Sequence, residues 1–267
     1  MSDRNLELAR QARLRPGAAA VEIPVLRARA GSAAEGFAAR FQGRHPATVF
    51  AAAVILGFLL AAALSIGLGA LVTDVLVRSS AIASADESFV TSLVAQRTPF
   101  LTDASAVGST VGSIMLSVLA LCVAVHFAFR RRWRIAAFAA FVPLVESALY
   151  RVTSLADPRT RPDVHRLEGL DVNASYPSGH TAASIAVYVG FVLLLTSRIT
   201  DRSTRWLAWT VALLIAVFVA MSRVYRGMHH PLDAAGGAMV GLGAIAVLLF
   251  ACRAAGAAAE IRNQEDR

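Results

Sequence analysis

The sequence contains no lysine, and it is poor in charge and in cysteine. All 26 of its basic residues are arginines, so no site in this chain uses a lysine side chain. Only 16% of the residues are charged, against about 25% in an ordinary soluble domain. The two cysteines, Cys122 and Cys252, stand far apart in apolar runs. These shortages argue against a soluble domain, a disulfide framework and a cysteine-based metal cluster.

Hydrophobic residues, by contrast, are abundant. They make up 56% of the 267 residues, and the mean hydropathy is +0.57. A bilayer span takes roughly 20 apolar residues, and six broadly apolar runs stand out along the chain. We predict an all-α fold, an integral-membrane bundle of six transmembrane helices. The approximate spans are 47–72, 106–129, 135–150, 180–197, 206–221 and 232–251.

The regions outside the spans are predicted to form two tails and one short interfacial helix. Residues 1–46 are rich in Arg and Ala, with Pro and Gly interrupting any period, and are predicted to form a disordered cytoplasmic tail. Residues 47–253 are predicted to form the transmembrane domain, and residues 254–267 a second cytoplasmic tail. A short amphipathic helix at the membrane interface is predicted over residues 86–96, between the first and second spans.

The arginines lie mainly between the apolar runs, and their distribution orients the chain. The N-terminal segment carries eight, the loops after the second and fourth spans carry four and three, and the C-terminal segment carries three. The other three loops carry two, four and two. Because cytoplasmic loops are enriched in arginine, both termini of this multi-pass cell-membrane protein are predicted to be cytoplasmic. The net charge of +8 then reflects membrane topology, and no nucleic-acid partner is expected.

Two loops on the predicted outer side hold nearly all of the residues suited to chemistry. One joins the third and fourth spans, and the other joins the fifth and sixth. Both loops face the same side of the membrane, so their side chains are expected to converge. These residues are Arg159, Arg161, Ser178, Gly179, His180, Arg223, His229 and Asp233.

This set of residues suits a phosphate group. Arg161 and Arg223 offer planar, bidentate donors to phosphate oxygens. Ser178 offers a hydroxyl, and Gly179 lets the backbone approach an anion closely. Both stand where the fourth span begins, and the N-terminus of a helix attracts anions.

A pair of histidines can supply both halves of a covalent phosphoryl transfer. His229 can attack phosphorus while His180 donates a proton to the leaving oxygen. Asp233 follows His229 by four residues, so its carboxylate can hold the imidazole in the attacking tautomer. A lone histidine near a membrane surface is usually an interfacial polar residue, and His230 is left without a role on that ground.

These residues resemble the motifs of the type 2 phosphatidic acid phosphatase (PAP2) superfamily. Pro-Ser-Gly-His at 177–180 matches one family element, and Ser-Arg-x5-His-x3-Asp at 222–233 matches another. The resemblance extends from the first span to the sixth and excludes both tails. It implies a membrane-branch PAP2 core that uses no metal or cofactor and works through a phosphohistidine. It also implies that His229 is the nucleophile, Asp233 its orienting partner and His180 the general acid. The implied phosphate ligands are Ser178, Gly179 and Arg223.

The first family element is only partly present. Its pattern is Lys, six residues and Arg-Pro, and Arg161-Pro162 matches its end. Ser154 stands where the lysine belongs. Arg159, two residues from Arg161, is one candidate to reach the same phosphate, and Arg151 is another that requires a local insertion.

The leading hypothesis is therefore an integral-membrane phosphatase whose substrate is a lipid phosphate or pyrophosphate. Polyprenyl pyrophosphate, phosphatidylglycerophosphate and phosphatidic acid all fit an outward-facing site. A phosphotransferase that passes the phosphoryl group to a lipid or sugar hydroxyl shares the first half-reaction and is the alternative. A transporter is a remote third hypothesis, because its ionisable residues belong near the bilayer midplane, whereas here they cluster at one rim.

Overall fold

A computed structural model describes residues 23–169 and 173–265. Within these ranges the chain is helical and forms no β-strand, which confirms the predicted all-α class. The elements in chain order are η2 (Pro24–Leu26), α2 (Ala33–Ala39), α3 (Pro46–Ala70), η3 (Leu71–Leu76), α4 (Ser80–Ala95), α5 (Pro99–Val111), α6 (Ile114–Phe129), α7 (Trp133–Ala156), α8 (Gly179–Ser184), η4 (Ile185–Val189), α9 (Gly190–Thr196), α10 (Arg202–Tyr225) and α11 (Pro231–Glu265).

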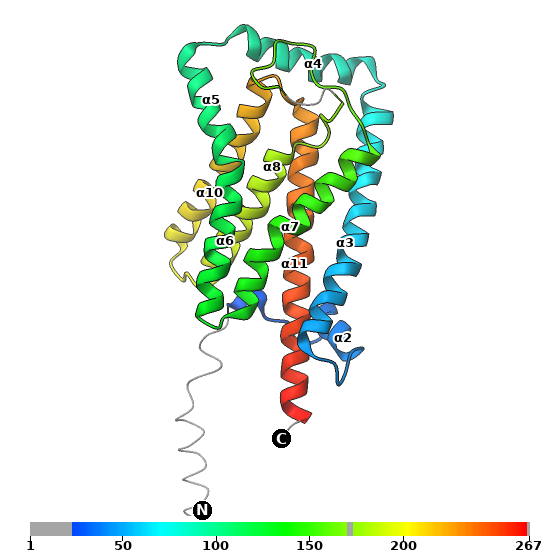
Figure 1. The fold of residues 1–267 in the computed structure, drawn as a ribbon, viewed down its shortest axis with the longest axis vertical. Helices are drawn as coiled ribbons and strands as arrows, with labels where there is room; N and C mark the ends of the chain where they lie inside the picture. Colours follow the sequence, from blue (N-terminus) through cyan, green and yellow to red (C-terminus); the bar gives the residue numbers. More distant parts are fainter. Residues whose placement is uncertain (1–22, 170–172, 266–267) are drawn as a thin grey trace, which may run out of the picture.

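The described residues include six helical segments long and apolar enough to cross a bilayer. They run side by side as a bundle, with the N- and C-terminal regions at the end opposite α4 (Figure 1). The segments are Pro46–Leu76, Pro99–Phe129, Trp133–Ala156, Gly179–Thr196, Arg202–Tyr225 and Pro231–Glu265. Each overlaps one predicted span. The fourth matches its prediction to within one residue at each end, whereas the second begins seven residues earlier than predicted and the sixth continues 14 residues further.

The fourth and sixth segments approach each other closely at glycines. A Cβ atom at Gly237 would lie 2.3 Å from the carbonyl oxygen of Ser178, and one at Gly241 would lie 2.5 Å from that of Ala182. Small residues of this kind let two membrane helices pack backbone to backbone. The start of α8 is thereby held against the first turns of α11, which brings two of the predicted motifs together.

Part of the predicted disordered tail is structured. Residues 1–22 lie outside the described residues, but residues 23–46 contain η2 and the short helix α2. Leu26 is 1% exposed, and Ala34 and Ala38 pack among alanines near the end of α11. The expected C-terminal tail is also helical as far as Glu265. The helical extension of α11 supplies the apolar surface against which α2 packs. The composition of residues 1–46 alone does not reveal this distant surface.

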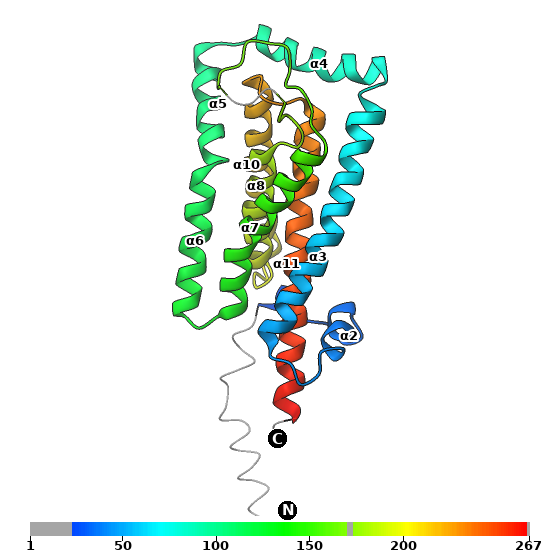
Figure 2. The ribbon, with the colours of Figure 1, turned by 45° about the vertical axis from the view of Figure 1, so that its right-hand side comes forward.

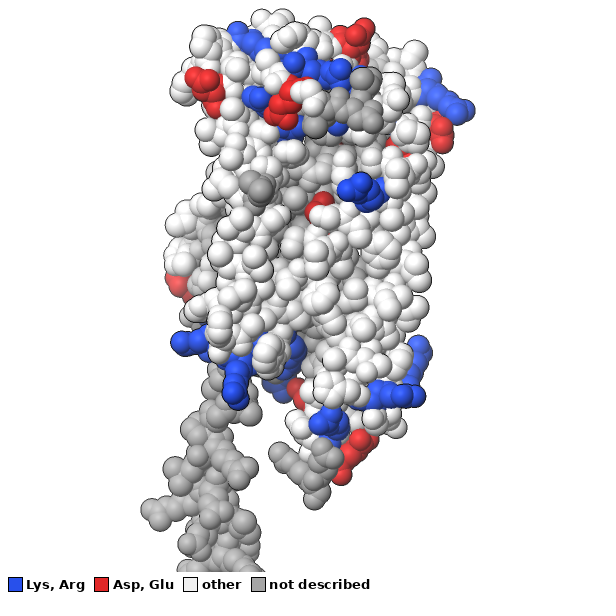
Figure 3. Space-filling model, in the orientation of Figure 1, with Lys and Arg blue, Asp and Glu red and all other residues white. Residues whose placement is uncertain are grey.

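The helix α4 lies across one end of the bundle (Figures 1 and 2). It covers residues 80–95, so the interfacial helix predicted over residues 86–96 begins earlier. The loop between α7 and α8 and the loop between α10 and α11 meet at the same end. In the space-filling view, charged side chains gather at the two ends, and the waist between them is almost uncharged (Figure 3). That distribution suits a bundle whose middle is surrounded by lipid.

Candidate active site

His229 is buried, and its ring is oriented by the backbone. Its Nδ1 lies 2.7 Å from the carbonyl oxygen of Ser175. A carbonyl oxygen only accepts hydrogen bonds, so Nδ1 carries the proton and Nε2 keeps its lone pair. The guanidinium of Arg161 places Nη1 3.5 Å from that Nε2. The unprotonated nitrogen of His229 therefore faces a cationic side chain.

The surroundings of His229 keep it neutral. Burial lowers its pKa to about 3, and the charges of Arg161 and Arg223 add to this effect against the opposing charge of Asp233. An imidazole with so low a pKa holds its lone pair at any physiological pH. The ring thus meets the first requirement of a nitrogen nucleophile.

Asp233 does not contact His229 as the sequence predicted. Its Oδ2 lies 4.0 Å from His229 Nδ1, which is too long for a hydrogen bond. The same oxygen instead accepts from the hydroxyl of Ser175 at 2.6 Å and from the backbone N–H of His230 at 2.8 Å. Since Ser175 also supplies the carbonyl that holds His229, Asp233 acts on the imidazole through Ser175.

Arg159 is engaged with carboxylates. Its Nη1 lies 2.6 Å from Asp233 and its Nη2 lies 2.7 Å from Asp86 of α4, with all three side chains buried. The sequence offered Arg159 as a replacement for the missing lysine at the phosphate. Both of its terminal nitrogens are committed to these ion pairs, so the geometry favours a role in holding Asp233.

Arg161 and Arg223 are held differently. Arg161 donates to the carbonyl oxygens of Met228 and Ala174, which fixes its guanidinium beside His229. Arg223 is fully buried, and its Nη1 donates to Ser109 and Glu168. Its Nε and Nη2 have no hydrogen-bond partner among the described residues. Buried donors without partners are rare, and two on one guanidinium indicate a place for an anion.

The start of the fourth membrane segment borders the same place. Ser178 is fully buried; its N–H donates to the carbonyl oxygen of Asp233, and its hydroxyl accepts from Thr181. At Gly179, a Cβ atom would lie 3.2 Å from the ring of Tyr150, so a larger residue would be crowded. The ring of His180 is half-buried and is subject to the charges of Arg223, Glu168 and Arg161.

The structure thus brings most of the predicted site residues to one end of the bundle. Several partners escaped the sequence analysis: Ser175, His230, Glu168, and the carboxylates Asp86 and Glu87 of α4. The sequence offers one clue to these partners: Asp86 and Glu87 form an acidic pair in the short segment between the first two spans, on the predicted outer side. Among the described residues, no group of three or more His, Cys, Asp or Glu side chains is arranged to hold a metal ion.

Comparison with known proteins agrees with this architecture. Residues 152–255 match the model of the PAP2 superfamily. The chain is 29% identical over 169 residues to phosphatidylglycerophosphatase B of Bacillus subtilis, an alignment that covers 62% of this chain and 82% of that protein. It is 40% identical over 75 residues to an undecaprenyl-diphosphatase of Sulfolobus acidocaldarius, covering 28% of this chain and 32% of that protein.

A solved structure shares the fold. The transmembrane PAP2-type phosphatidylglycerolphosphate phosphatase from Bacillus subtilis superposes with a TM-score of 0.57 at 26% sequence identity, covering 83% of this chain and 96% of that chain. The fold and the motif residues define a multi-pass helical membrane protein with a histidine- and arginine-lined site. Residues 152–255 are thus similar to the PAP2 superfamily, and the homologues of the chain are membrane lipid phosphatases.

Proposed function

We propose that this protein is a lipid phosphate or pyrophosphate phosphatase that works through a phosphohistidine on His229. The observation that carries the proposal is the protonation state of His229. Its Nδ1 is bound to a carbonyl oxygen, and its Nε2 lone pair faces Arg161. A phosphoryl group held by Arg161 and by the two unpaired nitrogens of Arg223 would lie in front of that lone pair.

The proposed reaction has two steps. First, Nε2 of His229 attacks phosphorus, the bond between phosphorus and the leaving oxygen breaks, and His180 gives its proton to that oxygen. Water then attacks the phosphohistidine while His180 takes back a proton, and the P–N bond breaks to release phosphate. The arginines stabilise the charge on the phosphoryl oxygens throughout. Neither step requires a metal ion.

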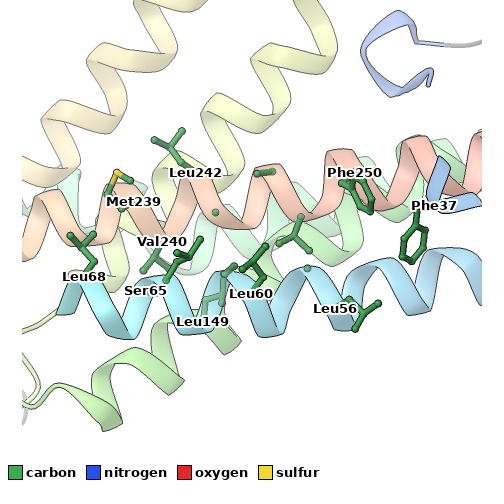
Figure 4. Close-up of a pocket in the computed structure, with 16 residues that line it drawn as sticks. Phe37, Leu56, Leu60, Ser65, Leu68, Leu149, Met239, Val240, Leu242 and Phe250 are labelled. Carbon is green, nitrogen blue, oxygen red and sulfur yellow. The ribbon is translucent and has the colours of Figure 1, made fainter. Parts of the chain in front are cut away.

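An apolar groove supports a substrate with a lipid tail. It measures about 640 Å³, lies between α3 and α11, and receives Phe37 from α2 at one end (Figure 4). Met239, which lines it, follows Asp233 by six residues, or about 9 Å along a helix. A prenyl or acyl chain in this groove would leave its phosphate near the end of the bundle where the site lies. The homologues named for phosphatidylglycerophosphate and undecaprenyl diphosphate favour these two substrate classes.

We also propose that the site faces the extracytoplasmic side of the cell membrane. The N- and C-terminal regions lie at the end opposite the site (Figure 1). The loop after α6 and the loop after α9, which carry four and three arginines, also lie toward that end. The positive-inside rule assigns an arginine-rich end to the cytoplasm. Cysteine-accessibility labelling of Phe100→Cys, at the exposed start of α5, tests this orientation in intact cells.

A phosphate-release assay tests the proposed reaction. Purified protein is expected to release phosphate from a panel of lipid phosphates in the presence of EDTA. His229→Ala is expected to reduce release about a thousandfold or more, because the nucleophile is gone. His165→Ala is the matched control, since this exposed histidine is at the same end and, within the described part of the chain, only its backbone oxygen takes part in a hydrogen bond. Loss of turnover in EDTA, or full activity of His229→Ala, would contradict the proposal.

A further inference from the structure

The interfacial helix α4 contributes two carboxylates to the buried network around the site. Asp86 accepts from Arg159 at 2.7 Å and also from the backbone N–H of Leu232, in the first turn of α11, at 3.1 Å. Its neighbour Glu87 reaches His230, with 2.9 Å between Oε2 and Nε2. Through these contacts α4 is connected to the loop after α7 and to the start of α11. Nothing in the reaction proposed above uses Glu87 or His230.

His230 is held between two carboxylates. Its Nε2 faces Glu87, and its Nδ1 lies 3.2 Å from Oδ2 of Asp233. An ionised carboxylate only accepts hydrogen bonds, so both contacts are hydrogen bonds when both ring nitrogens carry a proton. The geometry therefore suits an imidazolium cation. Its ring is 7% exposed, whereas Glu87 is 39% exposed, so the helix α4 closes one side of the ring.

A short chain of contacts leads from this cation to the nucleophile. The oxygen of Asp233 that meets His230 is also the oxygen that accepts from the Ser175 hydroxyl at 2.6 Å. The carbonyl of the same serine accepts from Nδ1 of His229 at 2.7 Å. Each link is direct, and together they connect α4 with the imidazole whose tautomer the reaction needs.

We propose that His230 and Glu87 are positioning residues. A doubly protonated His230, held by Glu87 of α4, fixes Asp233 on Ser175 and thereby fixes the orientation of His229. The inference rests on the proposed function, because it concerns the same nucleophile. It gives α4 a part in turnover, and it assigns a role to the histidine that directly follows the nucleophile in the sequence.

The pH dependence follows from the charged groups around His230. Glu87 faces it from α4, Asp233 from α11, and Arg159 from the loop after α7. Burial and the charge of Arg159 oppose protonation, but the hydrogen bond and charge of Asp233 and the hydrogen bond of Glu87 outweigh them and raise the pKa of His230. The cation is therefore complete below the ordinary histidine pKa of about 6.5 and is lost as pH rises through the raised value. Activity should fall on that alkaline side.

The test compares the pH profiles of phosphate release for wild type, Glu87→Gln and His230→Asn in the full-length protein. Glu87→Gln removes the negative charge that favours the cation, so the alkaline midpoint should move to lower pH. His230→Asn keeps a donor for Asp233 but cannot titrate, so this fall in activity should disappear. At neutral pH we expect kcat to decrease about tenfold in either variant, as loss of one charged hydrogen bond implies. The KM should change less than about twofold, because neither residue is placed at the phosphate.

Asp103→Asn is the matched control, since it makes the same carboxylate-to-amide change on α5, at an exposed position of the same end. It should leave the midpoint and kcat unchanged. An active wild type whose midpoint and kcat are the same in Glu87→Gln would overturn the inference alone. A KM increase that accounts for the whole loss would also overturn it. A wild type that releases no phosphate from any lipid in the panel would contradict the proposed function together with the inference.

Discussion

Arg159 and Arg223 are two buried arginines at the same end of the bundle, and they differ in whether their guanidinium nitrogens have partners. Both terminal nitrogens of Arg159 meet carboxylates, Asp233 and Asp86. Arg223 is buried even more completely, yet its Nε and Nη2 have no hydrogen-bond partner among the described residues. A buried cation with its partners in place holds other groups still, whereas unpaired donors are arranged for an anion that arrives from outside.

The network around Arg159 is expected to stabilise the fold, and Asp86→Asn is expected to have the largest effect on the free energy of unfolding. The substitution removes one carboxylate from a buried ion pair and weakens the contact with the first turn of α11. Breaking a buried pair in this way costs about 3 kcal/mol of unfolding free energy. Thermal or denaturant unfolding in detergent measures the change.

An exposed ion pair supplies the control for Asp86→Asn. Asp74 and Arg78 are 3.2 Å apart, and their side chains are 60% and 75% exposed. Because solvent screens such a pair, Asp74→Asn should change stability by less than about 0.5 kcal/mol. Equal effects of the two substitutions would contradict the claim that the Arg159 network holds this end of the bundle.

Arg223→Lys tests whether the unpaired nitrogens of Arg223 bind phosphate. Lysine keeps the charge but loses the planar fork, and with it the nitrogens proposed to bind phosphate. We expect phosphate release to fall about 100-fold, as for the loss of a preorganised donor at a transition state. The free energy of unfolding should change less than for Asp86→Asn, because lysine keeps a charge for Glu168, and Nε and Nη2 have no hydrogen-bond partner among the described residues.

Arg226 is the informative contrast to Arg223. It lies three residues later, and each of its three nitrogens has a partner, in Glu168, Ser105 and Leu167. Arg226→Lys should therefore lose stability and retain most of its activity. If instead Arg226→Lys loses as much activity as Arg223→Lys, unpaired donors do not distinguish the phosphate ligand from its neighbours.

The same contrast explains what the sequence could predict. Spans and motifs are local patterns, so the six membrane segments and the candidate residues His180, Arg223, His229 and Asp233 can be predicted from the sequence. The network is not local. His230 meets Glu87 across 143 residues, and Arg159 meets Asp86 across 73. No sequence pattern links a histidine beside the proposed nucleophile to an acidic pair in a short interfacial helix. Only the fold brings them together.

Distance in sequence also accounts for the two differences in detail. The role of Asp233 was predicted from its four-residue spacing to His229, which puts both near one helix start. That spacing does not reveal Ser175, 58 residues from Asp233, which takes the hydrogen bond instead. Likewise the glycines and proline of the N-terminal segment indicate breaks in any helix, but the alanine surface that orders α2 lies on α11, more than 200 residues away.

Glu168→Gln is expected to have the smallest effect of the series. Its carboxylate binds Nη1 of Arg223 at 2.8 Å and Nε of Arg226 at 2.6 Å. Burial opposes its charge, but these two arginines and Ser109 lower the pKa of Glu168 to about 2. The group is therefore ionised at any working pH, and it competes with phosphate for the charge of Arg223. Removing that competitor should tighten inhibition by inorganic phosphate about fivefold, or about 1 kcal/mol. The inhibition constant measures this, and weaker inhibition would mean that Glu168 instead holds Arg223 in its binding position.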